Sequence, residues 1–136
     1  MTAYYQTEKE IQDVIENFES CITGKDNFGH YDHLTVAVWY LRNSTSDQAF
    51  EKMRFGLLRF LDHHAVSRAP YSDQLTMSWI NLVQSVIKQT DPDLSLVEVT
   101  NIVLDRLGHS RIVLEQDSQG CVKEVVQEDQ ANSQSE

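Results

Sequence analysis

Apolar residues recur every three or four positions through most of the chain up to residue 107, which is the period of amphipathic α-helices. Three serine or threonine residues stand three positions before a glutamate or glutamine, the spacing of a helix-starting capping box. These pairs are Thr7 with Glu10, Thr45 with Gln48, and Ser95 with Glu98. The pattern predicts five helices, over about residues 7–22, 30–42, 45–64, 72–89 and 95–107.

Two glycines have specific places in this pattern. Gly56 lies inside the third predicted helix, where glycine costs about 1 kcal/mol relative to alanine, so we expect it to permit close approach of another helix. Gly108 follows the fifth helix, where a C-terminal cap glycine belongs, and His109 after it is expected to satisfy that helix's last carbonyl groups. Cys21, on the apolar face of the first helix, is expected to be buried.

The pattern weakens after residue 107. Two short apolar patches, at residues 111–114 and 121–126, suit either helical turns or edge structure. From Gln127 the chain reads QEDQANSQSE, which contains nothing to bury and predicts a disordered acidic tail. We therefore expect an all-α fold, with a compact helical bundle at residues 1–115 and an irregular segment and disordered tail at 116–136.

Composition narrows the classes of partner. A chain of 136 residues with 40% hydrophobic residues fits a single domain. Eleven basic residues against 21 acidic ones give a formal charge of −10, which disfavours nucleic acid and anionic membranes as partners. We expect no transmembrane span and no signal peptide, because long apolar runs are absent. Cys21 and Cys121 form no CxxC pair, which indicates a reducing cytoplasm.

Four of the five histidines form the main candidate for chemistry. His30 and His33 are one helical turn apart on a face that continues into the buried stripe, and His64 lies on the stripe of the next helix, with His63 beside it at the rim. A short connection makes these two helices antiparallel neighbours, so their histidines come to the same end of the bundle. The next break, at Pro70, brings Tyr71, Ser72 and Asp73 to that end as well.

Two imidazoles at this spacing and a third from a neighbouring helix can bind a divalent transition metal. The predicted ligands are His30, His33 and His64, with Asp73 as a fourth ligand or an orienting acid, and zinc and iron(II) are both admissible. An open coordination position would then accept water or a small-molecule substrate. No GxGxxG or Walker motif is present, so no nucleotide cofactor is expected.

Two other interpretations stay open beside the metal site. In the first, His64 or His30 acts as a general base without metal, with Asp73 nearby, on a small polar substrate. In the second, the protein is a non-enzymatic helical module that binds a partner or forms a homo-oligomer, and its histidines only satisfy packing and hydrogen bonds. Whether the protein is an enzyme is not decided by the sequence.

The segment from Phe28 to Leu34 reads F-x-H-x-x-H-L, and a later Arg59-Phe60 precedes His64. Over about residues 28–115 the chain resembles a family of small bacterial helical proteins of uncharacterised function. The resemblance implies that His30, His33 and His64 correspond to family histidines and Asp73 to a family acidic position. The chain departs from the pattern at Ser72, where the family has another histidine, so one implied ligand is missing.

Overall fold

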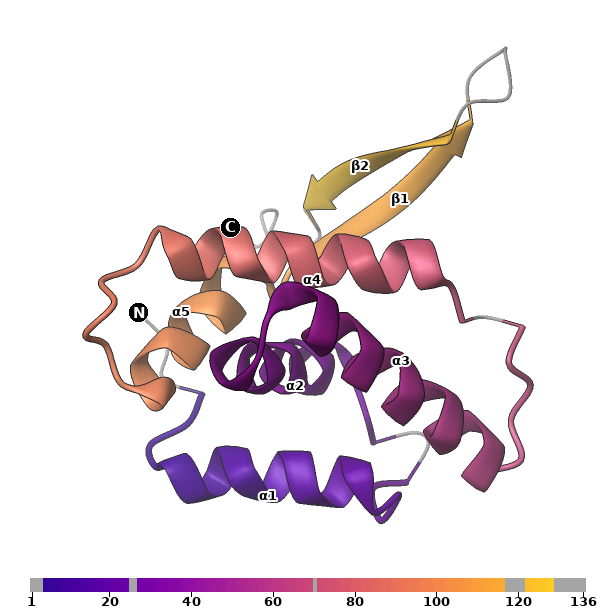
Figure 1. The fold of residues 1–136 in the computed structure, drawn as a ribbon, viewed down its shortest axis with the longest axis horizontal. Coiled ribbons are helices and arrows are strands. Elements are labelled where there is room, and N and C mark those ends of the chain that lie inside the picture. The colour runs from indigo at the N-terminus through magenta and orange to yellow at the C-terminus, as the bar shows by residue number, and fades with distance from the viewer. Residues whose placement is uncertain (1–3, 25–26, 70, 117–121, 129–136) are drawn as a thin grey trace, which may run out of the picture.

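The computed structural model describes residues 4–24, 27–69, 71–116 and 122–128 (Figure 1). The described chain forms five helices followed by two strands. These elements are α1 (Glu8–Glu19), α2 (His30–Asn43), α3 (Ser46–His63), α4 (Asp73–Lys88), α5 (Leu96–Leu107), β1 (Ser110–Gln116) and β2 (Val122–Glu128). The prediction of a compact bundle of five helices is confirmed. Within the described residues no helix has the length and apolar character needed to cross a membrane.

Helix boundaries follow the local signals that predicted them. The three capping boxes all form, and they start α1, α3 and α5. The predicted end of the first helix at residue 22 is wrong, because α1 ends at Glu19 and Cys21 takes a left-handed φ of 58°. Cys21 is buried as predicted, whereas Ile22 is 71% exposed and lies off the apolar face.

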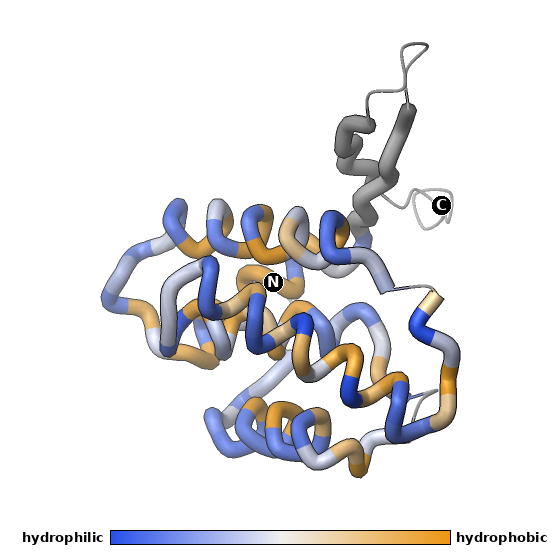
Figure 2. The backbone as a smooth tube through the Cα atoms, turned by 45° about the vertical axis from the view of Figure 1, so that its right-hand side comes forward, coloured by the Kyte–Doolittle hydropathy of each residue, from blue (hydrophilic) through white to orange (hydrophobic). Residues whose placement is uncertain are grey.

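Helix α2 is the centre of the bundle and packs against all four other helices (Figure 1). Residues 34–38 are all buried, as is Tyr40, so the helix has almost no solvent-facing side. The surrounding helices are amphipathic, and Figure 2 shows the hydrophobic positions of α4 on the side facing the bundle. A helix that is apolar around its circumference must be covered on all sides, and the other helices cover α2.

Both glycines noted in the sequence are sites of close packing. A Cβ atom on Gly56 would lie 2.7 Å from the ring of Phe18 on α1, which confirms the expected close approach. Gly108 ends α5 in a right-handed conformation, with φ −63°, so the left-handed cap geometry typical of glycine is not used. A side chain at Gly108 would instead collide with the ring of Tyr31.

The two apolar patches near the C-terminus form an antiparallel pair of strands. The register places Val113 opposite Val125 and Ile112 opposite Val126. The sequence left these patches undecided, and the expected irregular segment after residue 115 is wrong over Val122–Glu128, which forms a strand. β-Branched residues favour extended backbone, which agrees with strands here. The acidic tail was predicted from Gln127, and this start is wrong, because Gln127 and Glu128 belong to β2. The rest of the predicted tail lies outside the described residues.

The contact between Gly56 and Phe18 predicts that Gly56→Ala destabilises the fold. Alanine gains about 1 kcal/mol of helix propensity, but its methyl group meets a fully buried ring and overpacking costs about 1–3 kcal/mol. We expect a net loss of about 1 kcal/mol in the free energy of urea unfolding. The same substitution should cost less in a Phe18→Leu background, and a stabilised Gly56→Ala protein would contradict the contact.

Candidate functional site

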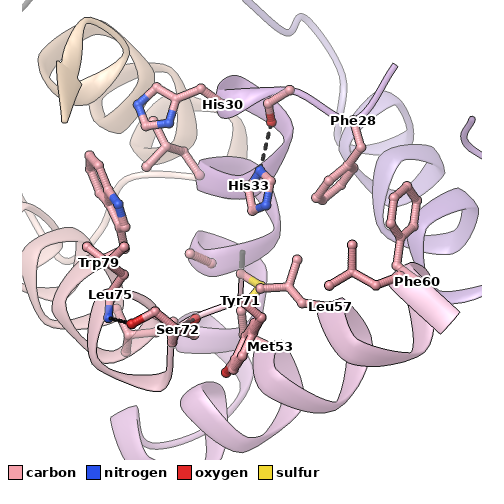
Figure 3. A pocket seen from close by; sticks show the side chains of 16 residues that line it. Phe28, His30, His33, Met53, Leu57, Phe60, Tyr71, Ser72, Leu75 and Trp79 are labelled. Carbon is pink, nitrogen blue, oxygen red and sulfur yellow. Dashed lines mark hydrogen bonds between the residues drawn. The ribbon is translucent and has the colours of Figure 1, made fainter. Parts of the chain in front are cut away.

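A cavity of about 520 Å³ lies where the beginnings of α2 and α4 meet the C-terminal half of α3 (Figure 3). This is the end of the bundle at which the sequence predicted a histidine-lined pocket. The lining residues come from the loop before α2, from three helices and from the segment before α4. They are Phe28, Gly29, His30, His33, Leu34, Ala37, Met53, Leu57, Phe60, Leu61, Tyr71, Ser72, Leu75, Thr76, Trp79 and Ile80.

The lining is mainly apolar, and among the described residues no Asp, Glu, Lys or Arg contributes to it. Polar groups of the lining residues are the imidazoles of two histidines, the hydroxyl groups of Tyr71, Ser72 and Thr76, the indole N–H of Trp79 and the backbone at Gly29. The volume falls within the range of about 300–1,000 Å³ typical of small-molecule pockets, which are apolar with a few placed polar groups.

His33 has one ring nitrogen engaged and the other open. Its Nδ1 lies 3.0 Å from the carbonyl oxygen of Gly29, one turn earlier (Figure 3). A carbonyl oxygen only accepts, so Nδ1 carries the proton and donates it, and Nε2 of the neutral ring is an acceptor. No hydrogen bond to Nε2 is found within the described part of the chain. The ring of Phe28 packs against the imidazole, with ring centroids 4.4 Å apart.

Burial lowers the pKa of His33, and the neighbouring His30 lowers it further, while the hydrogen bond to Gly29 acts in the opposite direction. Burial penalises the charged imidazolium. The ring is therefore neutral at pH 7, and the acceptor at Nε2 is retained.

His30 has a different role, because its Nε2 lies 3.0 Å from the carbonyl oxygen of Leu107 at the end of α5. The ring donates a proton there and packs edge-on against Trp79, at a centroid distance of 4.9 Å. The carbonyl that we expected His109 to satisfy is thus bound by His30, while His109 lies beside the ring of Tyr31. His30 therefore ties α2 to α5 at the edge of the cavity.

Ser72 and Tyr71 line the cavity from the start of α4. The Oγ atom of Ser72 accepts from the backbone N–H of Leu75 at 3.1 Å, so it caps the helix, and its carbonyl oxygen accepts from the hydroxyl of Thr76. The hydroxyl of Tyr71 is buried and lies near the side chains of Thr76 and Asp73, without a well-aligned hydrogen bond to either. Burial raises the pKa of Tyr71, so the phenol keeps its proton.

The structure places the other two predicted site residues outside the cavity lining. His64 is the C-cap residue that follows α3, and its ring packs on Phe60 and His63 with centroid distances of 4.5 and 5.0 Å. Its Nε2 is buried without a partner in the described residues. The carboxylate of Asp73 is exposed and accepts from Nε of Arg54 at 3.0 Å.

The predicted ligands consequently do not form a coordination set in this structure. His33 packs on Phe28 and His64 on Phe60, and the two phenyl rings pack on each other at 5.4 Å. Over the described ranges, no group of three or more His, Cys, Asp or Glu side chains is arranged to hold a metal ion. Helical spacing placed the histidines at the correct level but did not indicate the ring of Phe28, which lies on the loop before α2 and follows no helical period.

No family model, no curated protein and no solved structure matches the chain. The resemblance to the F-x-H-x-x-H-L family stays a prediction, so a functional proposal must rest on the geometry of the cavity.

The lowered pKa of His33 predicts a pH-dependent stability. The unfolded chain has the ordinary histidine pKa of about 6.5, and the folded value is lower, so the unfolded state binds protons more readily between the two. The neutral ring of His33 therefore contributes its full stability above pH ~6.5, and this contribution is lost as pH falls toward the pKa of the folded state. The loss is about 1.4 kcal/mol for each unit by which the folded pKa lies below the unfolded one.

Urea unfolding of wild type and His33→Asn between about pH 7.5 and 5 measures this effect. Asparagine can still donate to the Gly29 carbonyl but does not titrate, and the other histidines are common to both proteins. We expect the unfolding free energy of wild type to fall more steeply with decreasing pH than that of His33→Asn. Parallel curves would show that His33 is not the titrating group.

Proposed function

We propose that this protein binds a small, uncharged and largely apolar molecule that donates one hydrogen bond to Nε2 of His33. The observation that carries the proposal is an apolar cavity of about 520 Å³ that contains an imidazole fixed as an acceptor by its second nitrogen. Such pockets combine apolar walls, which supply affinity, with few polar atoms, which set orientation.

The apolar walls favour a ligand with a hydrocarbon or aromatic body. Phe28, Phe60 and Trp79 present rings to the cavity, and aliphatic side chains from α2, α3 and α4 complete it (Figure 3). Transferring apolar surface from water contributes about 25 cal/mol per Å². A hydroxyl or N–H on the ligand would meet His33, and the buried hydroxyl of Tyr71 is a further polar group in the lining.

The absence of ionised groups from the described lining argues against a charged ligand. A carboxylate or ammonium group entering the cavity would lose its hydration without gaining an opposite charge. The neutral state of His33 at pH 7 removes one possible cation from the lining. Alcohols, phenols, neutral amines and amides are therefore favoured over organic acids.

A general-base reaction is a second candidate function, and the free acceptor on His33 supports it. The sequence proposed His64 or His30 as this base. His64 is absent from the lining, and His30 binds Leu107 through Nε2, which leaves only its Nδ1 as an acceptor. Nε2 of His33 can accept a proton from a bound hydroxyl, since the hydrogen bond to Gly29 fixes the ring and its tautomer.

Metal binding through His30, His33, His64 and Asp73 stays a separate hypothesis, and the arrangement of the described residues gives it no support. A cytoplasmic location and a homo-oligomeric state also stay hypotheses. The single described cysteine, Cys21, is free and buried, which is compatible with a reducing compartment.

A fluorescent probe tests the proposed binding. N-phenylnaphthylamine is neutral, apolar and carries one N–H, whereas anilinonaphthalenesulfonate adds an anionic sulfonate to the same framework. We expect the neutral probe to bind wild type at least about tenfold more tightly than the sulfonate, a difference of about 1.4 kcal/mol. Titration of each probe by fluorescence gives the two dissociation constants.

His33→Asn should weaken binding of the neutral probe by about tenfold, because the substitution removes the acceptor at Nε2 while retaining the hydrogen bond to Gly29. Ala37→Leu, which places a larger side chain in the lining, should weaken both probes. A matched control is His109→Asn, which changes an exposed histidine outside the cavity lining. Equal affinities of wild type and both cavity variants for the neutral probe would overturn the proposal.

A further inference from the structure

A second depression lies on the solvent side of α3 and is distinct from the apolar cavity. It encloses about 590 Å³, and we call its seven lining residues the α3 outer face. These residues are Arg54, Phe55, Leu58, Arg59, Asp62, His63 and Arg68. All but Arg68 lie on α3, at spacings that place them on one side of the helix.

We propose that the α3 outer face binds an acidic peptide segment of a partner protein, with a carboxylate on Arg59 and an apolar side chain against Phe55 and Leu58.

The centre of the face is apolar and accessible. Phe55 is 64% exposed, which makes it one of three large hydrophobic side chains at the surface of the described residues, and it lies on a helix that is otherwise amphipathic. The guanidinium carbon of Arg59 lies 5.0 Å from the centroid of the Phe55 ring. This cation–π contact holds the charge next to the apolar surface. Leu58 is half-buried beside it and extends the apolar area.

The charge of the face is opposite to that of the chain. Its lining has three guanidinium groups and one carboxylate, whereas the chain carries 21 acidic and 11 basic residues. Arg68 is paired with Asp62 at 2.6 Å and Arg54 with Asp73 at 3.0 Å. In the described chain Arg59 has no acidic partner within ion-pair distance, and its Nε is buried without a hydrogen bond.

An unpaired guanidinium beside an exposed phenyl ring matches a carboxylate next to an apolar residue. Arginine binds carboxylates through parallel N–H donors, which gives geometric selectivity. At physiological salt, interactions between exposed charges are screened over about 8 Å. A short acidic segment on this face is therefore attracted by its arginines and is only weakly repelled by acidic residues elsewhere on the chain. A nucleic acid is longer than this face and would be repelled by the acidic residues of the rest of the chain. A second copy of the protein would be repelled as a whole, because it also carries a net charge of −10.

Fluorescence anisotropy with full-length protein tests the proposal. The probe is a short fluorescein-labelled peptide in which leucine and phenylalanine are flanked by glutamates, and its counterpart carries glutamine at every glutamate. We expect binding of the glutamate peptide that weakens with added salt, and at least about tenfold weaker binding by Arg59→Gln and by Phe55→Ala. Lys88→Gln, which removes an equal charge from the exposed surface of α4, should bind as wild type does.

Circular dichroism verifies that each variant is folded, and Phe55→Ala alters a side chain that is mostly exposed. The proposal is overturned if wild type fails to bind the glutamate peptide up to about 1 mM, or if the glutamine peptide binds equally well. It is also overturned if Arg59→Gln and Phe55→Ala bind as wild type does. Sedimentation showing a wild-type dimer that Phe55→Ala converts to monomer would assign the face to a second copy instead.

Discussion

Enclosure of α2 by the other four helices determines the fold. Five consecutive residues of this helix, 34–38, are buried, so no orientation of α2 at a surface would hide its apolar side chains. Its buried polar groups are satisfied within the bundle. Tyr40 donates to Glu19 at 2.6 Å, and the hydroxyl of Thr35 donates to the carbonyl of Tyr31 and lies 3.0 Å from that of Tyr5.

The enclosure of α2 also creates the cavity. Helices α3 and α4 cover the sides of α2, but the start of α2 contributes Gly29, His30 and His33 in place of large aliphatic side chains. The aromatic rings of Phe28 and Phe60 line one side of the resulting space. The two histidines of one helical turn consequently differ in role. His30 fixes α5 through Leu107, and His33 bonds only to its own helix start and leaves one nitrogen for a ligand.

The fold was largely predictable because its helices depend on local signals. Capping boxes and apolar stripes located four of the five helices to within about two residues of their observed bounds, and Gly56 indicated a close helix approach. The end of α1 was predicted wrongly because Cys21 adopts a left-handed conformation, and cysteine is not a residue type that favours this conformation. The strands were left undecided because short apolar patches lack a distinguishing period.

The candidate site was predictable in place but not in chemistry. Antiparallel packing brought His30, His33 and Ser72 to one cavity, as expected. Hydrogen-bond partners determine which ring nitrogens are free, and these partners come from distant backbone groups such as the carbonyl of Leu107. Helical spacing contains no information about such contacts. Nor did helical spacing indicate that the carboxylate of Asp73 would form an ion pair with Arg54 and not with a histidine.

Ligand binding as proposed requires a neutral His33, with its proton on Nδ1 and an acceptor at Nε2 available to the cavity. Long-range nitrogen–proton NMR correlation spectra of ¹⁵N-histidine-labelled protein at about pH 7 report protonation of each ring nitrogen directly, and His33→Asn assigns the signal. We predict a protonated Nδ1 and an unprotonated Nε2 for His33. A signal with the proton on Nε2, or with both nitrogens protonated, would contradict the proposed role of His33.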